Sequence, residues 1–364
     1  MAISEDISDL FKNPTSILER YKSLETKVLG YTCSYIPEEL IISAGLQPYR
    51  IPNVGAKPSA LTPSFICPFS SAVLENAIKH EDFFSGFVVA HTCDPMWRLY
   101  DILKKKTSKP VFLLRVPHNT EDDLSLEFFE KELCRFKEFL EENFNTKIDG
   151  TELLKAIRLC NENRSLLKGI FMQNSEGKYV GDALERFQLT IASMWMPKAY
   201  VNVKIKEWKL NNEKSVSISK VRLHLNGTAI YDLNLIGAVE EAGGFIASDD
   251  LCTGSRYFWD NVEEKGEPLL ALAHRYLKKT PCPPQSPIES RLEYTKFMVK
   301  KFKAQGVITF TERFCDPTLY DSVHLKDMLT KEGIPTTLID YENPSQELGR
   351  IKTRIEAFIE SLGG

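Results

Sequence analysis

Several features that mark other protein classes are missing from this sequence. No apolar run reaches the roughly 18 residues that a membrane-spanning helix needs. The opening residues, MAISEDISDLFKNP, lack the basic segment and apolar stretch of a secretory signal peptide. The 46 basic and 50 acidic residues give a net charge of −4, which does not favour a broad nucleic-acid surface. We therefore expect a cytoplasmic globular protein that binds neither membrane nor nucleic acid.

Three motifs are also absent. No pair of cysteines has the C-x2-C spacing of common structural zinc sites. The six histidines show no metal-binding spacing. The phosphate-binding motif G-x4-G-K-[ST] does not occur, so this chain is not expected to hydrolyse ATP.

The pattern that is present predicts an α/β protein. At 364 residues, the chain is long enough for about two domains. Short apolar strands alternate with helices in both halves, which is typical of parallel sheets covered on both faces. We predict two Rossmann-like or flavodoxin-like parallel-sheet domains joined by a helical segment. The first comprises residues 1–196, with an N-terminal helix and bridging helices; residues 197–219 form the connection and residues 220–364 the second domain.

The individual elements follow from hydrophobic periodicity. Strands are predicted over 46–51, 86–91, 110–116, 221–225, 244–247, 307–311 and 336–339. Helices are predicted over 7–21 with a break at 13–14 and a possible cap at Ser16, and over 37–44, 70–79, 95–105, 122–144, 151–171, 181–195, 233–242, 266–276, 290–304, 320–332 and 351–362.

The eight cysteines fall into two groups. Cys134 and Cys160 lie inside predicted helices, where a cysteine usually packs as a small apolar residue. The other six lie in loops at strand ends or helix starts, namely Cys33, Cys67, Cys93, Cys252, Cys282 and Cys315. Loops at the carboxyl ends of parallel strands converge on ligands, and a helix N-terminus favours the thiolate form of cysteine.

Composition leaves several interpretations of the six loop cysteines open. They can be buried thiols of a reduced cytoplasmic protein, where disulfides are not expected. A zinc site is disfavoured by their spacing. A nucleophile paired with a base is conceivable for Cys93, since His91 precedes it by two residues. An iron–sulfur cluster held by dispersed cysteines also fits loops that converge.

The residues around the cysteines resemble those of the 2-hydroxyacyl-CoA dehydratase and benzoyl-CoA reductase superfamily. The similar segments are residues 30–40 (GYTCSYIPEEL), 44–45, 92–94 (TCD), 314–317 (FCDP) and 353–358 (TRIEAF). Three further segments, 65–68 (FICP), 250–254 (DLCTG) and 281–283 (PCP), resemble the double-cubane cluster proteins within that superfamily.

The resemblance implies an oxygen-sensitive iron–sulfur enzyme that works under anaerobic conditions. A separate activator with its own cluster would hydrolyse ATP and deliver low-potential electrons. Dehydratase subunits of this type hold one 4Fe-4S cubane by three cysteines, here Cys33, Cys93 and Cys315. A double cubane, 8Fe-9S with a bridging sulfide, would use all six loop cysteines, and we favour it; the 314–317 loop is more similar to the dehydratase version.

Three functions follow from the resemblance. The first is a reductase of small molecules at a double cubane, expected to be a homodimer. The second is the 4Fe-4S subunit of a radical 2-hydroxyacyl-CoA dehydratase, a lyase, or of a benzoyl-CoA-reductase-like enzyme, acting on an acyl-CoA as a heterodimer with a related chain. The third is an electron carrier without catalysis.

Some neighbouring residues are weaker candidates. Ser34, Glu38 and Glu39 adjoin Cys33 and can polarise a substrate or simply complement a helix N-terminus. Asp94 and Asp316 each follow a cysteine and are expected to cap helices. Arg256 is expected to pair with Asp249 or Asp250, with anion binding as the alternative. The segment 226–228 (NGT) ends a strand and can be a phosphate cradle or an ordinary turn.

Overall fold

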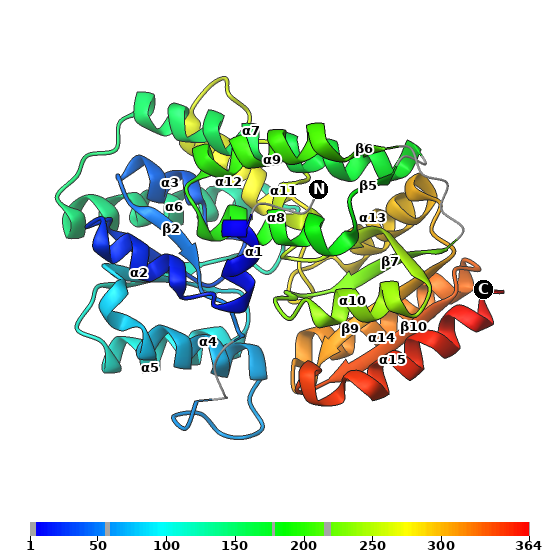
Figure 1. The fold of residues 1–364 in the computed structure, drawn as a ribbon. Helices are drawn as coiled ribbons and strands as arrows, with labels where there is room; N and C mark the ends of the chain where they lie inside the picture. Colours follow the sequence, from blue (N-terminus) through cyan, green and yellow to red (C-terminus); the bar gives the residue numbers. More distant parts are fainter. Residues whose placement is uncertain (1–4, 55–58, 177–178, 215–219, 364) are drawn as a thin grey trace.

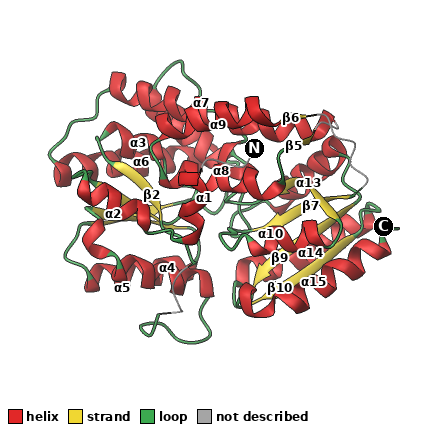
Figure 2. Ribbon diagram, viewed as in Figure 1, coloured by secondary structure: helices red, strands yellow, loops and turns green. Residues whose placement is uncertain are grey.

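Two four-stranded parallel sheets form the framework of the molecule. The computed structural model describes residues 5–54, 59–176, 179–214 and 220–363. The two sheets stand side by side, and the long helices α7 (Gly150–Gln173) and α9 (Lys198–Asn212) lie across the top in Figure 1. Figure 2 shows helices packed around the strands of each half. The predicted α/β class with two parallel sheets is therefore confirmed.

The N-terminal sheet has the strand order β2-β1-β3-β4. Its strands are β1 (Val28–Tyr31), β2 (Gln47–Arg50), β3 (Gly86–His91) and β4 (Val111–Arg115). Its helices are α1 (Glu5–Lys12), α2 (Ser16–Ser23), α3 (Glu38–Ser43), α4 (Pro68–Lys79), α5 (Asp94–Lys106) and α6 (Asp123–Phe144), with a short 3-10 turn η1 (Glu81–Phe83). The inner strands read as continuous apolar runs because both faces are covered.

The C-terminal sheet has the order β10-β9-β7-β8. Its strands are β7 (Val221–Gly227), β8 (Gly244–Asp250), β9 (Gly306–Glu312) and β10 (Thr336–Tyr341). Its helices are α10 (Asn234–Glu241), α11 (Ser255–Phe258), α12 (Pro268–Lys278), α13 (Ile288–Phe302), α14 (Asp316–Lys331) and α15 (Pro344–Ser361). Helix α12 packs against α6 of the N-terminal half, so the chain returns to the first sheet before it completes the second.

The middle of the chain is helical. Helix α8 (Ala183–Trp195) packs on α7, and η2 (Asn174–Glu176) follows α7. A small antiparallel pair joins β5 (Tyr179–Val180) to β6 (Glu213–Lys214). Most of the expected 197–219 connection is α9, which buries Val201, Ile205 and Trp208 on one side. Residues 215–219 lie outside the described residues, and the domain boundaries stay a prediction.

Other differences from the expected elements are local. Strand β8 runs on to include Asp249 and Asp250, and the short helix α11 was not predicted. Ser16 is the first residue of α2 and does not cap it; Thr15 stands at the cap position without a side-chain cap. Among the described residues, no helix combines the length and apolarity needed to cross a membrane.

Candidate functional site

The order of the strands identifies where ligands are expected to bind. In each sheet the chain starts at a central strand, adds one neighbour, and then crosses to the other side of the first strand. The crossing falls between β1 and β3 in one sheet and between β7 and β9 in the other. Open parallel sheets bind ligands outside the carboxyl ends of the strands at such switch points.

Cysteines occupy these strand ends. Cys33 follows β1 and Cys93 follows β3, at the switch point of the N-terminal sheet. Cys315 follows β9, and Cys252 follows β8, the edge strand of the C-terminal sheet. Cys67 precedes α4, and Cys282 lies in the loop before α13. The two sheets thus contribute three loop cysteines each.

All six loop cysteines line one pocket between the two sheets. The pocket has a cavity volume of about 80 Å³. Its other lining residues are mostly apolar or weakly polar, among them Phe69, Pro95 and Met96. Cys67, Cys252 and Cys282 are buried, whereas Cys33, Cys93 and Cys315 are partly exposed. We call this pocket the cysteine pocket; Cys134 and Cys160 do not line it, in agreement with their predicted structural role.

Three of the cysteines cap helices. Cys67, Cys93 and Cys315 stand at the cap positions of α4, α5 and α14, and a proline lies in the first turn of each helix. Proline suits this turn because its missing N–H would have no helical partner there. Each thiol therefore faces the unpaired N–H groups of a helix N-terminus, which stabilise a thiolate.

The thiols also perturb one another. A hydrogen bond with Cys67 lowers the pKa of Cys315 to about 7, and the same bond raises the pKa of Cys67. A hydrogen bond between Cys252 and Cys282 likewise lowers the pKa of Cys252 and raises that of Cys282. One thiol of each pair therefore loses its proton at a lower pH than an ordinary cysteine does. A metal-containing group that binds thiolates can replace these protons.

Cys93 does not have the environment of a nucleophile. Burial raises the pKa of Cys93 to about 12. The ring of His91 packs on Trp97 with 4.6 Å between ring centroids, and burial lowers the pKa of this histidine. No hydrogen bond joins His91 to Cys93 among the described residues, so a thiol and imidazole pair is not assembled.

Two buried cations border the pocket without a carboxylate partner in the described part of the chain. Arg50 is 1% exposed; its Nη1 donates to the carbonyl of Cys252 at 2.8 Å, and its Nε has no partner. Lys279 is 4% exposed, and its Nζ donates to the carbonyl of Ser34 at 2.6 Å. Burial lowers the pKa of Lys279 to about 7, while Cys33 and the other nearby thiols act in the opposite direction. An unpaired buried charge is costly, so an anionic group in the pocket would stabilise both.

Two ion pairs hold the loops of the C-terminal cysteines. Arg256 pairs with Asp250 at 2.8 Å, as predicted, and donates to the carbonyl of the same aspartate. Arg291 pairs with Asp321 and donates through Nη1 to the carbonyl of Cys282 at 3.0 Å. Because all four side chains are buried, these pairs fix the backbone that carries the thiols.

Within the described ranges, no group of three or more histidine, cysteine or carboxylate side chains is placed to hold one ion. Six cysteines around one pocket, with unpaired buried cations beside them, fit an anionic iron–sulfur cluster.

Ser34, Glu38 and Glu39 lie outside the lining of the cysteine pocket. The Oγ of Ser34 accepts from Lys279 at 3.1 Å. Glu38 accepts hydrogen bonds from the hydroxyls of Tyr31 and Tyr257 and pairs with Lys198 at 2.9 Å. Glu39 pairs with Arg164 and accepts from Tyr276, and these contacts lower its pKa against burial, which acts to raise it. These buried contacts give the three residues structural partners, and a catalytic role for Ser34 and Glu38 stays a prediction.

The remaining candidates serve to position backbone. Asp94 and Asp316 are the first residues of α5 and α14, because the preceding cysteines take the cap positions.

The 226–228 turn is followed by no helix until α10, so it is not a phosphate cradle. Instead, the carbonyl of Thr228 accepts from the N–H of Cys252 at 2.9 Å. A Cβ on Gly227 would lie 2.6 Å from the carbonyl oxygen of Phe310, so only glycine fits there.

Sequence reasoning missed the residue that connects this pocket to a larger cavity. Glu312, the last residue of β9, lines both the cysteine pocket and a cavity of about 910 Å³. Burial raises the pKa of Glu312 to about 8. The signal in the sequence for Glu312 was a charged residue at the end of an otherwise apolar strand. Arg50 gives the same signal at the end of β2.

Comparison with known proteins identifies relatives along the whole chain. A family model described as 2-hydroxyglutaryl-CoA dehydratase, D-component, matches residues 33–362. The (R)-phenyllactyl-CoA dehydratase beta subunit of Clostridium sporogenes is 26% identical, covering 98% of each chain. A benzoyl-CoA reductase subunit of Thauera aromatica is 26% identical over 92% of this chain and 91% of its own. The (R)-2-hydroxyglutaryl-CoA dehydratase subunit beta of Acidaminococcus fermentans is 26% identical, covering 99% of each chain.

Proposed function

Since the chain belongs to the 2-hydroxyglutaryl-CoA dehydratase D-component family, we propose that it is an iron–sulfur enzyme that accepts low-potential electrons from an ATP-hydrolysing activator and reduces a small molecule. We assign a double-cubane cluster to the cysteine pocket. Its ligands would be Cys33, Cys67, Cys93, Cys252, Cys282 and Cys315. The dehydratase and benzoyl-CoA reductase names of the relatives support the enzyme class.

One observation carries this proposal: all six loop cysteines line the same pocket. A single cubane with three cysteine ligands would account for only half of them. Arg50 and Lys279 add support, because both are buried without a carboxylate partner among the described residues. An anionic group bound by thiolates would supply the missing negative charge.

When bound, such a cluster supplies iron atoms without a protein ligand, where a small molecule can receive electrons. The protein's own residues would set the conditions for that chemistry. Phe69, Pro95 and Met96 restrict water, and low water access strengthens every charge interaction in the pocket. The cationic side chains favour the more negative, reduced state. The helix N-termini at Cys67, Cys93 and Cys315 act in the same direction.

Iron and acid-labile sulfide, measured on anaerobically purified protein, test the assignment. We expect about eight iron atoms per chain for two cubanes held by six thiolates. About four per chain would overturn the double cubane and support the second candidate. An iron-free protein after anaerobic reconstitution would overturn both.

The second candidate is the 4Fe-4S subunit of a radical 2-hydroxyacyl-CoA dehydratase, a lyase. The names of the relatives favour it, because two of them are beta subunits of dehydratases. In that case Cys33, Cys93 and Cys315, the three partly exposed loop cysteines, would hold the cluster. Sedimentation of the purified chain discriminates here: a homodimer fits the reductase, and assembly only with a related second chain fits the dehydratase.

Exposed aromatic side chains close in sequence to three of the cysteines support contact with an activator. Phe65, Trp97 and Tyr320 are 72%, 42% and 82% exposed, and they belong to the segments that carry Cys67, Cys93 and Cys315. Aromatic residues are enriched in the centres of protein interfaces. We expect Tyr320→Asp to slow ATP-dependent cluster reduction by a cognate activator while iron content stays unchanged; an unchanged reduction rate would place the contact elsewhere.

A further inference from the structure

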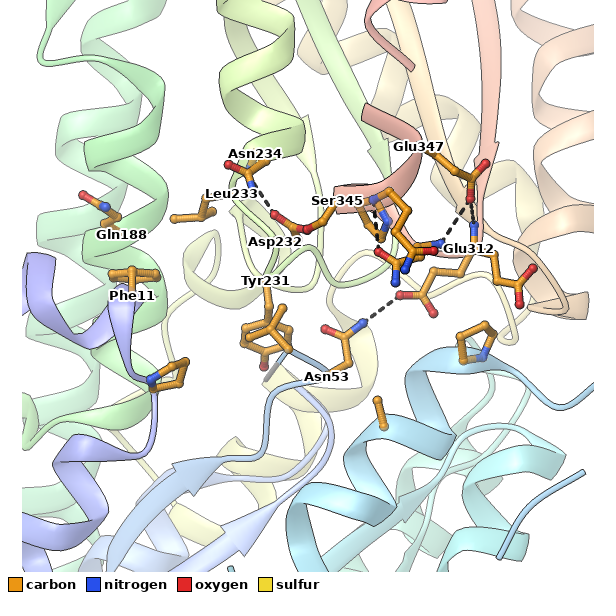
Figure 3. A pocket seen from close by; sticks show the side chains of 18 of the residues that line it. Phe11, Asn53, Gln188, Tyr231, Asp232, Leu233, Asn234, Glu312, Ser345 and Glu347 are labelled. Atoms are coloured by element: carbon orange, nitrogen blue, oxygen red, sulfur yellow. Dashed lines mark hydrogen bonds between the residues drawn. The ribbon is translucent and has the colours of Figure 1, made fainter. Parts of the chain in front are cut away.

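A second cavity, larger than the cysteine pocket, is separate from that pocket but shares a wall with it. It lies between the carboxyl end of the N-terminal sheet, the loop 231–234, and the start of α15 (Figure 3). Its volume of about 910 Å³ is in the range of binding sites for small organic molecules, roughly 300–1,000 Å³. Glu312 forms the wall that it shares with the cysteine pocket. We call it the carboxylate cavity.

Three buried polar atoms at this wall have no partner in the described part of the chain. They are Oε2 of Glu312, the hydroxyl of Tyr231 and Oδ1 of Asn53. Glu312 is 5% exposed and Tyr231 3% exposed. The other amide atom of Asn53, Nδ2, donates to Oε1 of Glu312 at 2.7 Å, as drawn in Figure 3. Because this bond uses the NH₂ group, Oδ1 of Asn53 is left as an acceptor.

Buried polar atoms without a partner cost free energy, so a bound molecule that satisfies them would be stabilised. The molecule must donate a hydrogen bond to Asn53, and it can also bond the Tyr231 hydroxyl and Oε2 of Glu312. Phe11, Trp195 and Leu233 supply an apolar side for the body of the molecule. Among the described residues these features select a small organic molecule with an N–H or O–H group.

The charge of the lining restricts the molecule further. The lining contains four carboxylates, those of Asp232, Glu312, Glu342 and Glu347. No lysine, arginine or histidine is among the described lining residues. Arg313 pairs with Glu342 at 3.2 Å and Arg350 pairs with Glu347 at 2.5 Å, but Asp232 has no basic partner within the described ranges. An anion would therefore meet the uncompensated carboxylate of Asp232 and no cation among the described lining residues.

We propose that the carboxylate cavity binds an uncharged or cationic small molecule with hydrogen-bond donors, and excludes polyanions such as coenzyme A thioesters. It deepens the function proposed above, on which it rests, by naming the substrate class of a reductase site. The relatives are named for coenzyme A thioesters, whereas the lining residues that the structure describes include no cation that would hold a nucleotide's phosphates. The inference rests on the size of the cavity and on the buried polar atoms in its wall that have no hydrogen-bond partner among the described residues.

Binding to the anaerobically purified holoprotein tests this by calorimetry. The probes are benzamide, benzylammonium and benzoate, which match in shape and differ in charge, and coenzyme A. We expect benzamide and benzylammonium to bind at least about tenfold more tightly than benzoate and coenzyme A. Equal or tighter binding of benzoate or coenzyme A would overturn the proposal.

Variants locate the binding. Tyr231→Phe should weaken benzamide binding about fivefold through the loss of one hydrogen bond. Asp232→Asn, which removes charge and keeps an acceptor, should leave benzamide binding unchanged and strengthen benzoate binding. Tyr100→Phe on α5, whose hydroxyl bonds the exposed Lys104 and lies outside the cavity lining, is the matched control and should have no effect. Unchanged benzamide affinity in Tyr231→Phe would overturn the assignment to this cavity. Because these are binding measurements, they can succeed even if the iron content refutes the proposed reduction.

Discussion

The two sheets are built alike, and their differences show how one topology is adapted to one shared pocket. Each winds in the same order from a central strand. In each, a glycine of the central strand is in register with a phenylalanine across the switch point: Gly30 with Phe87, and Gly227 with Phe310. In each, the strand after the crossing leads into a Cys-Asp-Pro segment that starts a helix.

The differences lie in the other ligands and in charge. The N-terminal sheet places Cys33 as the second residue after its central strand, where the C-terminal sheet has Ala229. The C-terminal half supplies Cys252 and Cys282 from loops held by buried ion pairs. The topology thus determines where ligands can be placed, and each half fills different positions of the same pocket.

The largest expected effect concerns the two matched cysteines. Cys93→Ser and Cys315→Ser should each remove at least half of the bound iron, because each thiol caps a helix at a switch point and lines the shared pocket. Iron and sulfide per chain and the visible absorption of anaerobic samples measure this. Cys134→Ser is the matched control on α6 and should keep full iron content. Full iron content in Cys93→Ser or Cys315→Ser would break the equivalence of the two sheets.

Much of this arrangement could be predicted from the sequence, because periodicity and strand ends are local properties. Seven of the eight strands of the two sheets, and the division into six loop and two helical cysteines, needed only patterns along the chain. Strand β1 was not predicted, because its four residues, Val28–Tyr31, are too few to show a period. Two features could be found only in the packed structure. Arg50 is buried without a carboxylate partner among the described residues, and Glu312 lines two cavities. The burial of Glu38 among Tyr31, Tyr257 and Lys198 likewise depends on residues far apart in sequence.

The second expected effect tests the matched glycines. A Cβ at residue 227 would lie 2.6 Å from the backbone carbonyl of Phe310, and the φ angle of +150° disfavours other residues. At Gly30 the nearest contact is the Phe87 ring, at 2.9 Å. We expect Gly227→Ala to lower the free energy of unfolding by about 3 kcal/mol and Gly30→Ala by about 1.5 kcal/mol. Urea unfolding measures both, and a larger loss for Gly30→Ala would reverse the comparison.

The third effect is a pH dependence from the fully buried histidine in the central strand of the C-terminal sheet. His224 in β7 is fully buried, and burial lowers its pKa to about 3, whereas β1 carries no histidine. The unfolded chain binds a proton there below about pH 6.5, so stability is present above that pH and lost as the pH falls. At pH 5 the loss is about 2 kcal/mol relative to pH 7.5. His224→Gln should remove this part of the pH dependence, and His324→Gln, on the surface, should retain it; the same pH profile in wild type and His224→Gln would contradict the assignment.

The smallest effect concerns the cations contributed by the two halves. Arg50 comes from the N-terminal sheet and Lys279 from the C-terminal half, and both lie buried beside the cysteine pocket without a carboxylate partner in the described residues. Removing either positive charge destabilises the reduced, more negative cluster more than the oxidised one. Arg50→Met and Lys279→Met should therefore each make the midpoint potential more negative by on the order of 60 mV, a tenfold change in a one-electron equilibrium. Anaerobic redox titration followed by electron paramagnetic resonance measures the shift, with Arg135→Met on the surface of α6 as control. Arg50 lines the pocket, and Lys279 acts electrostatically on Cys33, Cys252 and Cys282, so similar shifts are expected although they come from different halves. A shift confined to Lys279→Met would assign the electrostatic control to the C-terminal half alone.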